Sequence, residues 1–193
     1  MSVTSLSLLH RLQGGADTEA WKRLVSLYEP LIHNWLRRSQ ALPQDTDDLT
    51  QDVLMVVVRE VPRFAHNGRP GAFRSWLRQI TANRLRVFWR DGRGRPHATG
   101  GDFLALAEQL EDSDSPLSKA WDREHDEHVL SRLLELTARE FEPTTVEAFR
   151  RVALEGRPVE ETATDLGISP AAIYIAKSRV LRRLRQEAEG LLD

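Results

Sequence analysis

The spacing of apolar residues along the chain predicts a protein built from helices. From Asp17, a candidate N-cap, apolar residues recur every three or four positions, as on one face of a helix. These positions are Trp21, Leu24, Tyr28, Leu31 and Trp35. Pro30 lies inside this segment and predicts a kink or break, because proline cannot donate the backbone hydrogen bond that continues a helix. Strand-like alternation is absent.

Two further helices are predicted before residue 91. One begins near Thr46, where Asp47 and Asp48 would lie in the first turn and interact favourably with the helix dipole. Residues 64–71 contain Gly and Pro and predict a loop. The next helix spans about residues 72–90, and a rotation of about 100° per residue divides it into two faces. The apolar face holds Phe73, Trp76, Leu77, Ile80 and Val87, and the opposite arc holds Arg74, Arg78, Arg86 and Arg90.

Residues 158–185 carry the most informative local pattern. Gly167 follows a short apolar helix as a natural C-cap glycine, Ser169 is a candidate N-cap, and Pro170 suits the first position of the next helix. A turn of three or four residues between two such helices is typical of a helix-turn-helix, whose second helix enters the DNA major groove. A helical hairpin with a basic tail is the alternative interpretation of the same pattern.

The predicted fold class is all-α, with two small helical domains joined by an acidic flexible linker. The C-terminal domain contains the helix-turn-helix. Gly- and Ser-rich acidic sequence after Asp91 is too polar to fold alone, which predicts the linker. The expected division is an N-terminal arm (1–16), a first helical domain (17–91), the linker (92–124), the helix-turn-helix domain (125–187) and a tail (188–193).

Charge is segregated along the chain, although the 193 residues carry a formal net charge of only −2. Residues 59–95 hold ten arginines and two acids, residues 101–147 hold thirteen acids and four bases, and residues 169–185 hold five bases and no acid. Two basic blocks around an acidic one suggest two nucleic-acid-binding modules joined by a segment that avoids or imitates nucleic acid. In the first block arginines alternate with aromatic residues, as in proteins that bind single strands, although these rings also suit a core.

Three motifs in this order resemble the extracytoplasmic-function (ECF) sigma factors of the sigma-70 family. They are Asp-Asp-Leu-Thr-Gln-Asp-Val at residues 47–53, Phe-Arg-Ser-Trp-Leu at residues 73–77 with Ile80 and Asn83, and residues 156–184. The closing Val-Leu-Arg-Arg-Leu-Arg also fits. The resemblance covers about residues 17–91 and 125–187, so it includes nearly everything except the linker.

The resemblance implies a protein that binds core RNA polymerase and directs it to promoters, with residues 17–91 similar to sigma region 2 and residues 125–187 similar to sigma region 4. The polymerase would be bound by Asp47, Asp48, Gln51 and Asp52. The melted −10 element, with a flipped base, would be bound by Phe64, Asn67, Arg69, Phe73, Arg74, Trp76, Arg78, Asn83, Arg86 and Arg90. The duplex −35 element would be bound by Ser169, Pro170, Ala171, Ala172, Tyr174, Lys177, Ser178, Arg179 and Arg182.

The acidic linker would, by the same resemblance, thread the RNA channel of the polymerase. Two departures from the family concern DNA contacts: Val87 replaces an acidic residue of many relatives, and residues 174–177 are Tyr-Ile-Ala-Lys. The −35 preference of better-known members therefore does not transfer. An anti-sigma factor is a further candidate partner, and the family implies neither a cofactor nor a small-molecule substrate.

Catalysis is not expected. Gly92-Arg-Gly-Arg follows no strand, so it is not a phosphate-binding loop, and zero cysteines exclude disulfides and thiolate metal sites. His125 and His128, with Asp122 and Glu124 nearby, lack a clear third ligand for a metal ion. Such histidines more often form a polar helix face.

No apolar run is long enough for a membrane span, and a cytoplasmic location is expected.

Two non-enzymatic alternatives remain. A stand-alone helix-turn-helix repressor or activator would bind duplex DNA without polymerase, but no heptad run offers the dimer interface that spaces two half-sites. It would also leave the acidic helix start and the arginine-rich helix unexplained. A decoy that imitates a sigma factor would keep the acidic docking helix but lose the basic DNA-binding faces, and both are present.

Overall fold

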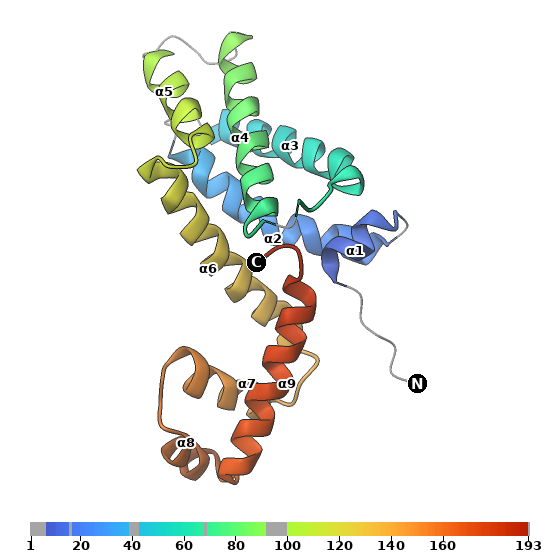
Figure 1. The fold of residues 1–193 in the computed structure, drawn as a ribbon, viewed down its shortest axis with the longest axis vertical. Helices are drawn as coiled ribbons and strands as arrows, with labels where there is room; N and C mark the ends of the chain where they lie inside the picture. Colours follow the sequence, from blue (N-terminus) through green and yellow to red (C-terminus); the bar gives the residue numbers. More distant parts are fainter. Residues whose placement is uncertain (1–6, 16, 39–42, 68, 92–99, 193) are drawn as a thin grey trace. The chain divides into compact units, whose positions relative to one another are not determined.

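A computed structural model describes residues 7–15, 17–38, 43–67, 69–91 and 100–192, and every regular element in these ranges is a helix (Figure 1). The all-α prediction is confirmed for this part of the chain. The described chain forms two compact units. We call residues 7–129 with residues 189–192 the N-terminal unit, and residues 130–188 the C-terminal unit. Within the same described ranges, no helix is long and apolar enough to cross a membrane.

The N-terminal unit begins with α1 (Leu8–Gln13), α2 (Thr18–Arg37), α3 (Pro43–Glu60), a 3-10 turn, η1 (Val61–Arg63), and α4 (Ala72–Arg90). Asp17 caps α2 as predicted, because its Oδ1 accepts from the backbone N–H of Ala20 at 2.9 Å. Of the kink or break predicted at Pro30, the break is wrong, since α2 continues through this residue. Tyr28, Leu31 and Trp35 are buried as the periodicity predicts.

Part of the predicted N-terminal arm is folded. Residues 1–6 and 16 lie outside the described residues, but α1 buries Leu8 and Leu12 completely. Asp17 accepts a hydrogen bond from Nε of Arg11 at 2.7 Å, which together with the cap lowers the carboxyl pKa to about 2. Residues of the predicted tail also pack here: a Cβ on Gly190 would lie 2.7 Å from Cδ2 of Leu9. Asp193 lies outside the described residues.

The expectation of a flexible linker over residues 92–124 is wrong for residues 100–124. Residues 92–99 lie outside the described residues, but α5 (Gly100–Glu111) and the first part of α6 (Pro116–Ala138) belong to the N-terminal unit. The α5 helix lies beside α4 in Figure 1. Polar composition suggested that this segment could not fold alone; α2 and α4 supply the apolar and basic surfaces on which Ala107, Leu110 and Trp121 become buried.

The predicted division of α4 into apolar and arginine faces is also wrong in part. The buried residues of α4 are Phe73, Leu77, Arg78, Thr81, Ala82, Leu85 and Phe88. Arg78 is therefore on the buried side, whereas Trp76, Ile80 and Val87 are only half-buried. The reason is a set of carboxylates on α6, described below, that makes burial of a guanidinium favourable on that side.

The C-terminal unit contains the end of α6, then α7 (Pro143–Phe149), a π-helical turn, η2 (Arg150–Leu154), α8 (Val159–Leu166) and α9 (Pro170–Ala188). Its small core joins Ala148 of α7, Ala163 of α8, and Ile173 and Ala176 of α9. Three small alanines let these helices approach closely. Val152, Val159, Leu166 and Ile168 are half-buried and pack against this core.

Candidate functional site

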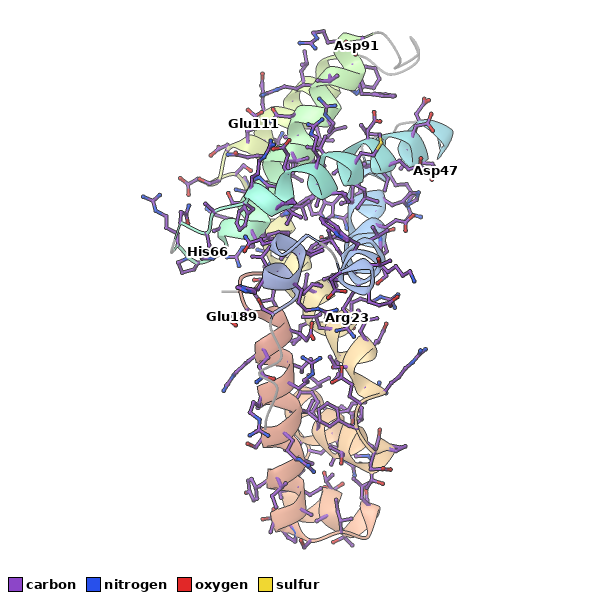
Figure 2. All side chains as sticks on the ribbon, turned by 90° about the vertical axis from the view of Figure 1, so that its right-hand side faces the viewer. Arg23, Asp47, His66, Asp91, Glu111 and Glu189 are labelled. Atoms are coloured by element: carbon purple, nitrogen blue, oxygen red, sulfur yellow. The ribbon has the colours of Figure 1, made fainter. Side chains whose placement is uncertain are left out.

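The beginning of α3 presents an acidic surface. Asp47, Asp48 and Gln51 are exposed and Asp52 is half-buried. Thr46 and Thr50 are buried and joined by a hydrogen bond from Thr50 Oγ1 to the Thr46 carbonyl at 2.7 Å. In Figure 2 the labelled Asp47 projects from the start of α3. The N-terminal part of α3 therefore presents its acidic side to solvent and its threonine side to the core. The structure brings together all four residues predicted for polymerase binding.

An aromatic cluster joins the first residue of the 64–71 loop to α4 and α2. The ring of Phe64 lies 5.4 Å from that of Phe73 and 5.0 Å from that of Trp76, and Phe73 lies 5.5 Å from Tyr28. Phe73 is 1% exposed, so it is a core residue and not available for base stacking, which corrects its sequence-based role. Phe64 and Trp76 are half-buried, so one part of each ring remains accessible.

The 64–71 loop is held at its start by a residue of α1 and contains one local hydrogen bond. Nε2 of Gln13 donates to the Phe64 carbonyl at 2.8 Å, and the N–H of Arg69 donates to Oδ1 of Asn67 at 3.0 Å. Gly71 has φ +74°, a left-handed conformation that favours glycine. Asn67 and Arg69 are exposed before this turn. Gly68 lies outside the described residues.

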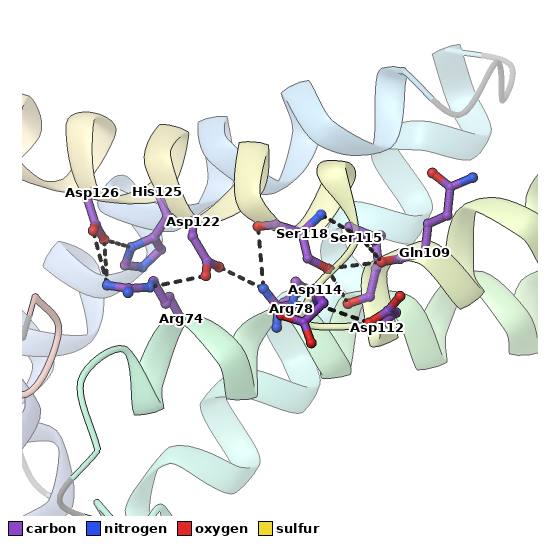
Figure 3. A network of polar contacts seen from close by, with 11 residues as sticks. Arg74, Arg78, Gln109, Asp112, Asp114, Ser115, Ser118, Asp122, His125 and Asp126 are labelled. Atoms are coloured by element: carbon purple, nitrogen blue, oxygen red, sulfur yellow. Dashed lines mark hydrogen bonds and ion pairs between the residues drawn. The ribbon is translucent and has the colours of Figure 1, made fainter.

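Three of the five arginines predicted to bind the −10 element are instead paired with acids of α5 and α6. Nη1 of Arg74 donates to Oδ2 of Asp126 at 3.0 Å, and Nη1 of Arg78 donates to Oδ1 of Asp122 at 2.7 Å (Figure 3). Arg86 is paired with Glu111. The Arg78 side chain is 3% exposed, so direct DNA contact by Arg78 is excluded in this conformation.

Two further predicted −10 residues of α4 remain accessible. Asn83 and Arg90 are exposed, and Arg90 lies 3.7 Å from Asp91 through its Nε. Gln79, which is not among the predicted residues, is exposed one turn before Asn83 on the same face. The structure thus separates the predicted −10 residues of α4 into an exposed group and a group that is buried or paired with acids of α5 and α6.

His125 and His128 act within the packing of α6 on α2. His125 is fully buried, with Nδ1 3.0 Å from Asp126 Oδ1 and Nε2 3.4 Å from the Tyr28 hydroxyl. A carboxylate only accepts, so Nδ1 carries the proton and Nε2 accepts from Tyr28. Burial lowers the pKa of His125, although Asp126 opposes this. His128 Nε2 lies 2.7 Å from the Leu27 carbonyl, so both histidines are occupied by protein partners.

The residues of α6 that hold α2 and α4 are not among the predicted site residues. The Trp121 ring is fully buried 4.9 Å from Trp35, and Arg38 forms a two-point ion pair with Glu124. One signal was available in the sequence: two acids four residues apart, at 122 and 126, match two arginines four residues apart, at 74 and 78. Spacing alone does not say which helices meet.

The turn between α8 and α9 has the geometry that the sequence predicts. Gly167 has φ +65°, the Ile168 N–H donates to the Ala163 carbonyl at 3.0 Å, and Ser169 Oγ accepts from the Ala172 N–H at 3.2 Å. The start of α9 is accessible beyond this turn. Its exposed residues include Pro170, Ala171, Tyr174, Ile175, Ser178, Arg179 and Arg182, whereas Ala172 and Lys177 are half-buried.

Comparisons with known proteins agree on one family. The Sigma-70 region 2 profile matches residues 24–95. The ECF RNA polymerase sigma factor ShbA of Streptomyces griseus is 30% identical over 188 residues, which cover 95% of this chain and 94% of that protein. The chain belongs to the ECF sigma factors of the sigma-70 family.

Other relatives of this sigma factor carry the same family name. The ECF RNA polymerase sigma factor SigD of Mycobacterium tuberculosis is 25% identical over 175 residues, covering 89% of this chain and 78% of that protein. A solved structure described as CnrH in complex with the cytosolic domain of CnrY covers 92% of each chain at 19% identity, with a TM-score of 0.38. The match to region 2 includes α3, the 64–71 loop and α4, which contain the acidic surface and the exposed residues described above.

Proposed function

We propose that this sigma factor binds core RNA polymerase and the −10 element through its N-terminal unit, and reads the −35 element with α9. The observation that carries the proposal is the region 2 match over residues 24–95, in a chain that also contains a capped helix pair with a basic second helix. A stand-alone repressor would account for the helix pair but not for region 2.

The acidic surface of α3 is proposed to bind the polymerase. Asp47, Asp48 and Gln51 are exposed together, and Asp52 extends the same surface. Exposed carboxylates at a helix start suit a basic protein partner, because complementary charge increases the rate and specificity of docking. Asp47 also lies 3.0 Å from His33 Nε2, so one carboxylate is oriented before a partner arrives.

The exposed side of the 64–71 loop and of α4 is proposed to hold the melted −10 strand. Asn67, Arg69, Asn83 and Arg90 are exposed there, and Trp76 with Phe64 provides half-buried rings at the loop. Extruding a base from the duplex costs a few kcal/mol, which stacking on a ring and arginine–phosphate contacts offset. Arg74, Arg78 and Phe73 are left out of this surface because of their pairing or burial.

The N-terminal half of α9 is proposed to read the −35 duplex. Ser169, Pro170, Ala171 and Ala172 begin the helix, and Tyr174, Lys177, Ser178, Arg179 and Arg182 follow along it. The exposed alanine and tyrosine offer apolar groups for thymine methyls, and the arginines offer cations for phosphates. Neither site alone is expected to bind tightly, because holding two weak sites at the promoter spacing supplies the affinity through effective concentration.

A run-off transcription assay tests the proposal. Purified bacterial core polymerase would be supplied with promoter fragments that include the upstream region of this gene, with and without the sigma factor. New start sites that require the protein support the proposal and identify both elements. Duplex binding by the protein alone, with neither transcripts nor co-elution with core polymerase, would favour the repressor instead.

The proposal also covers the cellular location of the protein and an anti-sigma factor as a further partner. A polymerase subunit works where the chromosome is, so we propose a location in the bacterial cytoplasm. An anti-sigma factor would compete for the acidic α3 surface or for the DNA surfaces. Affinity purification of the tagged chain with and without excess core polymerase tests this, because a competitor would be lost when core is added.

A further inference from the structure

Two acids of α6 and two arginines of α4 form a four-residue ladder. Asp122 and Asp126 are one turn apart on α6, and Arg74 and Arg78 are one turn apart on α4. Arg74 contacts both acids, through Nη1 to Asp126 at 3.0 Å and through Nε to Asp122 at 3.6 Å. Arg78 contacts Asp122 at 2.7 Å and also lies 3.4 Å from the Ser118 carbonyl. Figure 3 shows the acids facing the arginines across the two helices.

The ladder is built into the unit and is not a loose surface contact. The side chains of Arg74 and Arg78 are 19% and 3% exposed. The same part of α6 is fixed on α2 through Trp121 against Trp35 and through His125 against Tyr28. An ion pair that is partly buried and held by rigid neighbours is coupled more strongly than an exposed pair.

The arginines of the ladder lie on the side of α4 opposite the surface proposed for DNA. Nine residues separate Arg74 from Asn83, which places them on opposite sides of α4 at about 100° per residue. Gln79, Asn83 and Arg90 are exposed on the far side from Arg74. A strand bound there would lie across α4 from the Arg74 guanidinium.

We propose that Asp122 and Asp126 are positioning residues for promoter binding. They hold α4 through Arg74 and Arg78, on the side opposite the surface proposed for DNA. The exposed residues Asn83, Gln79 and Arg90 are thereby kept facing the melted strand. Arg74 and Arg78 then serve α6 and are not DNA ligands. This inference rests on the proposed function. Its rival is that α6 covers two arginines that bind DNA once they are released.

The neutral substitution Asp126→Asn separates the two ideas. If the acids position α4, holoenzyme containing this variant should bind a single-stranded −10 oligonucleotide about tenfold more weakly. If α6 instead covers DNA-binding arginines, the variant should bind the oligonucleotide more tightly, because Arg74 is released. Tighter binding overturns the proposal. Asp126→Glu, which keeps the carboxylate, should restore most of the affinity. Glu127→Gln, an exposed acid on the same helix, is the matched control and should bind like the wild type.

A double-mutant cycle provides a readout that does not require polymerase. Arg74→Gln, Asp126→Asn and the double variant would be compared by thermal unfolding and by tryptophan emission, since Trp121 on α6 is fully buried beside Trp35. Non-additive decreases in Tm, with a red shift in each single variant, support the ladder. Additive effects overturn it. If the wild type fails to direct transcription, the proposed function fails while this cycle still decides whether the ladder exists.

Discussion

Arg78 of α4 donates to Asp122 of α6 at 2.7 Å while its own side chain is 3% exposed. A charge at such a depth is stable only with a partner, because burial of an unpaired guanidinium costs several kcal/mol. The pair therefore joins the region 2 helices to a segment 44 residues further along the chain.

Asp122→Asn should destabilise the N-terminal unit strongly. The change leaves Arg78 buried with only a weak contact to the Ser118 carbonyl at 3.4 Å. We expect a loss of about 3 kcal/mol in the free energy of unfolding and a decrease in Tm of about 6–12 °C. Glu108→Gln, an exposed acid on α5, is the control. Equal Tm values for the two variants would mean that Arg78 does not depend on this partner.

Stability should decrease in mildly acidic solution because of His125. Burial holds its pKa below the ordinary value of 6.5, with Asp126, Asp122 and Arg74 as charged neighbours. Below pH 6.5 the unfolded chain binds a proton that the folded chain does not, so the contribution is complete above 6.5 and lost as the pH decreases toward the folded pKa. The slope from this one group is at most about 1.4 kcal/mol per pH unit.

Urea unfolding at several pH values between 7 and 5 measures this effect. His125→Gln cannot titrate, so its stability should change less over the same range than that of the wild type. His66→Gln, on an exposed loop, is the control and should keep the wild-type slope. A slope unchanged in His125→Gln would show that other groups cause the dependence.

Gly71→Ala should cost more than Gly156→Ala, although both glycines have positive φ values of +74° and +69°. The left-handed conformation costs any L-residue about 1–2 kcal/mol. At Gly71 an added Cβ would also lie 2.5 Å from Cζ of Arg74, whereas at Gly156 nothing lies within 4 Å. Chemical denaturation of both variants measures the difference, and equal costs would show that Arg74 moves aside freely.

Arg179→Ala and Tyr174→Ala should change −35 binding in different ways. Arg179 is proposed to contact phosphate, so its loss should weaken binding to all sequences and reduce the salt slope by about one. Tyr174, 59% exposed, is proposed to contact bases, so its loss should change sequence preference at an unaltered slope. Holoenzyme binding to −35 duplexes at several salt concentrations measures both, with Lys119→Ala as control. Identical slopes for Arg179→Ala and wild type would exclude the phosphate contact.

Asp48→Lys should weaken polymerase binding without unfolding the protein. Asp48 is exposed on the acidic surface of α3, where reversed charge would repel a basic partner. We expect an increase of about tenfold in the Kd for core polymerase. Glu29→Lys on α2 makes the same charge change at another exposed position and should bind normally. Equal weakening by both variants would point to overall charge instead of a docking surface.

The sequence alone determined the elements whose signals are local. Apolar spacing located the helix over residues 18–37, and Gly167, Ser169 and Pro170 marked the turn before α9, because caps and periodicity act within a few residues. The three motifs were sufficient to indicate the family, which the comparisons then established.

The tertiary structure decided which polar residues are buried and which segments fold. The acidic segment looked like a linker because its own apolar content is low, yet α5 and α6 fold on surfaces that earlier helices supply. The arginines of α4 looked like one DNA-binding face, but the burial of Arg78 depends on an aspartate 44 residues away. Helical periodicity shows which side chains share a face of one helix. Whether an arginine-containing face is buried depends on tertiary packing, because another helix must supply the carboxylates that pair with the arginines.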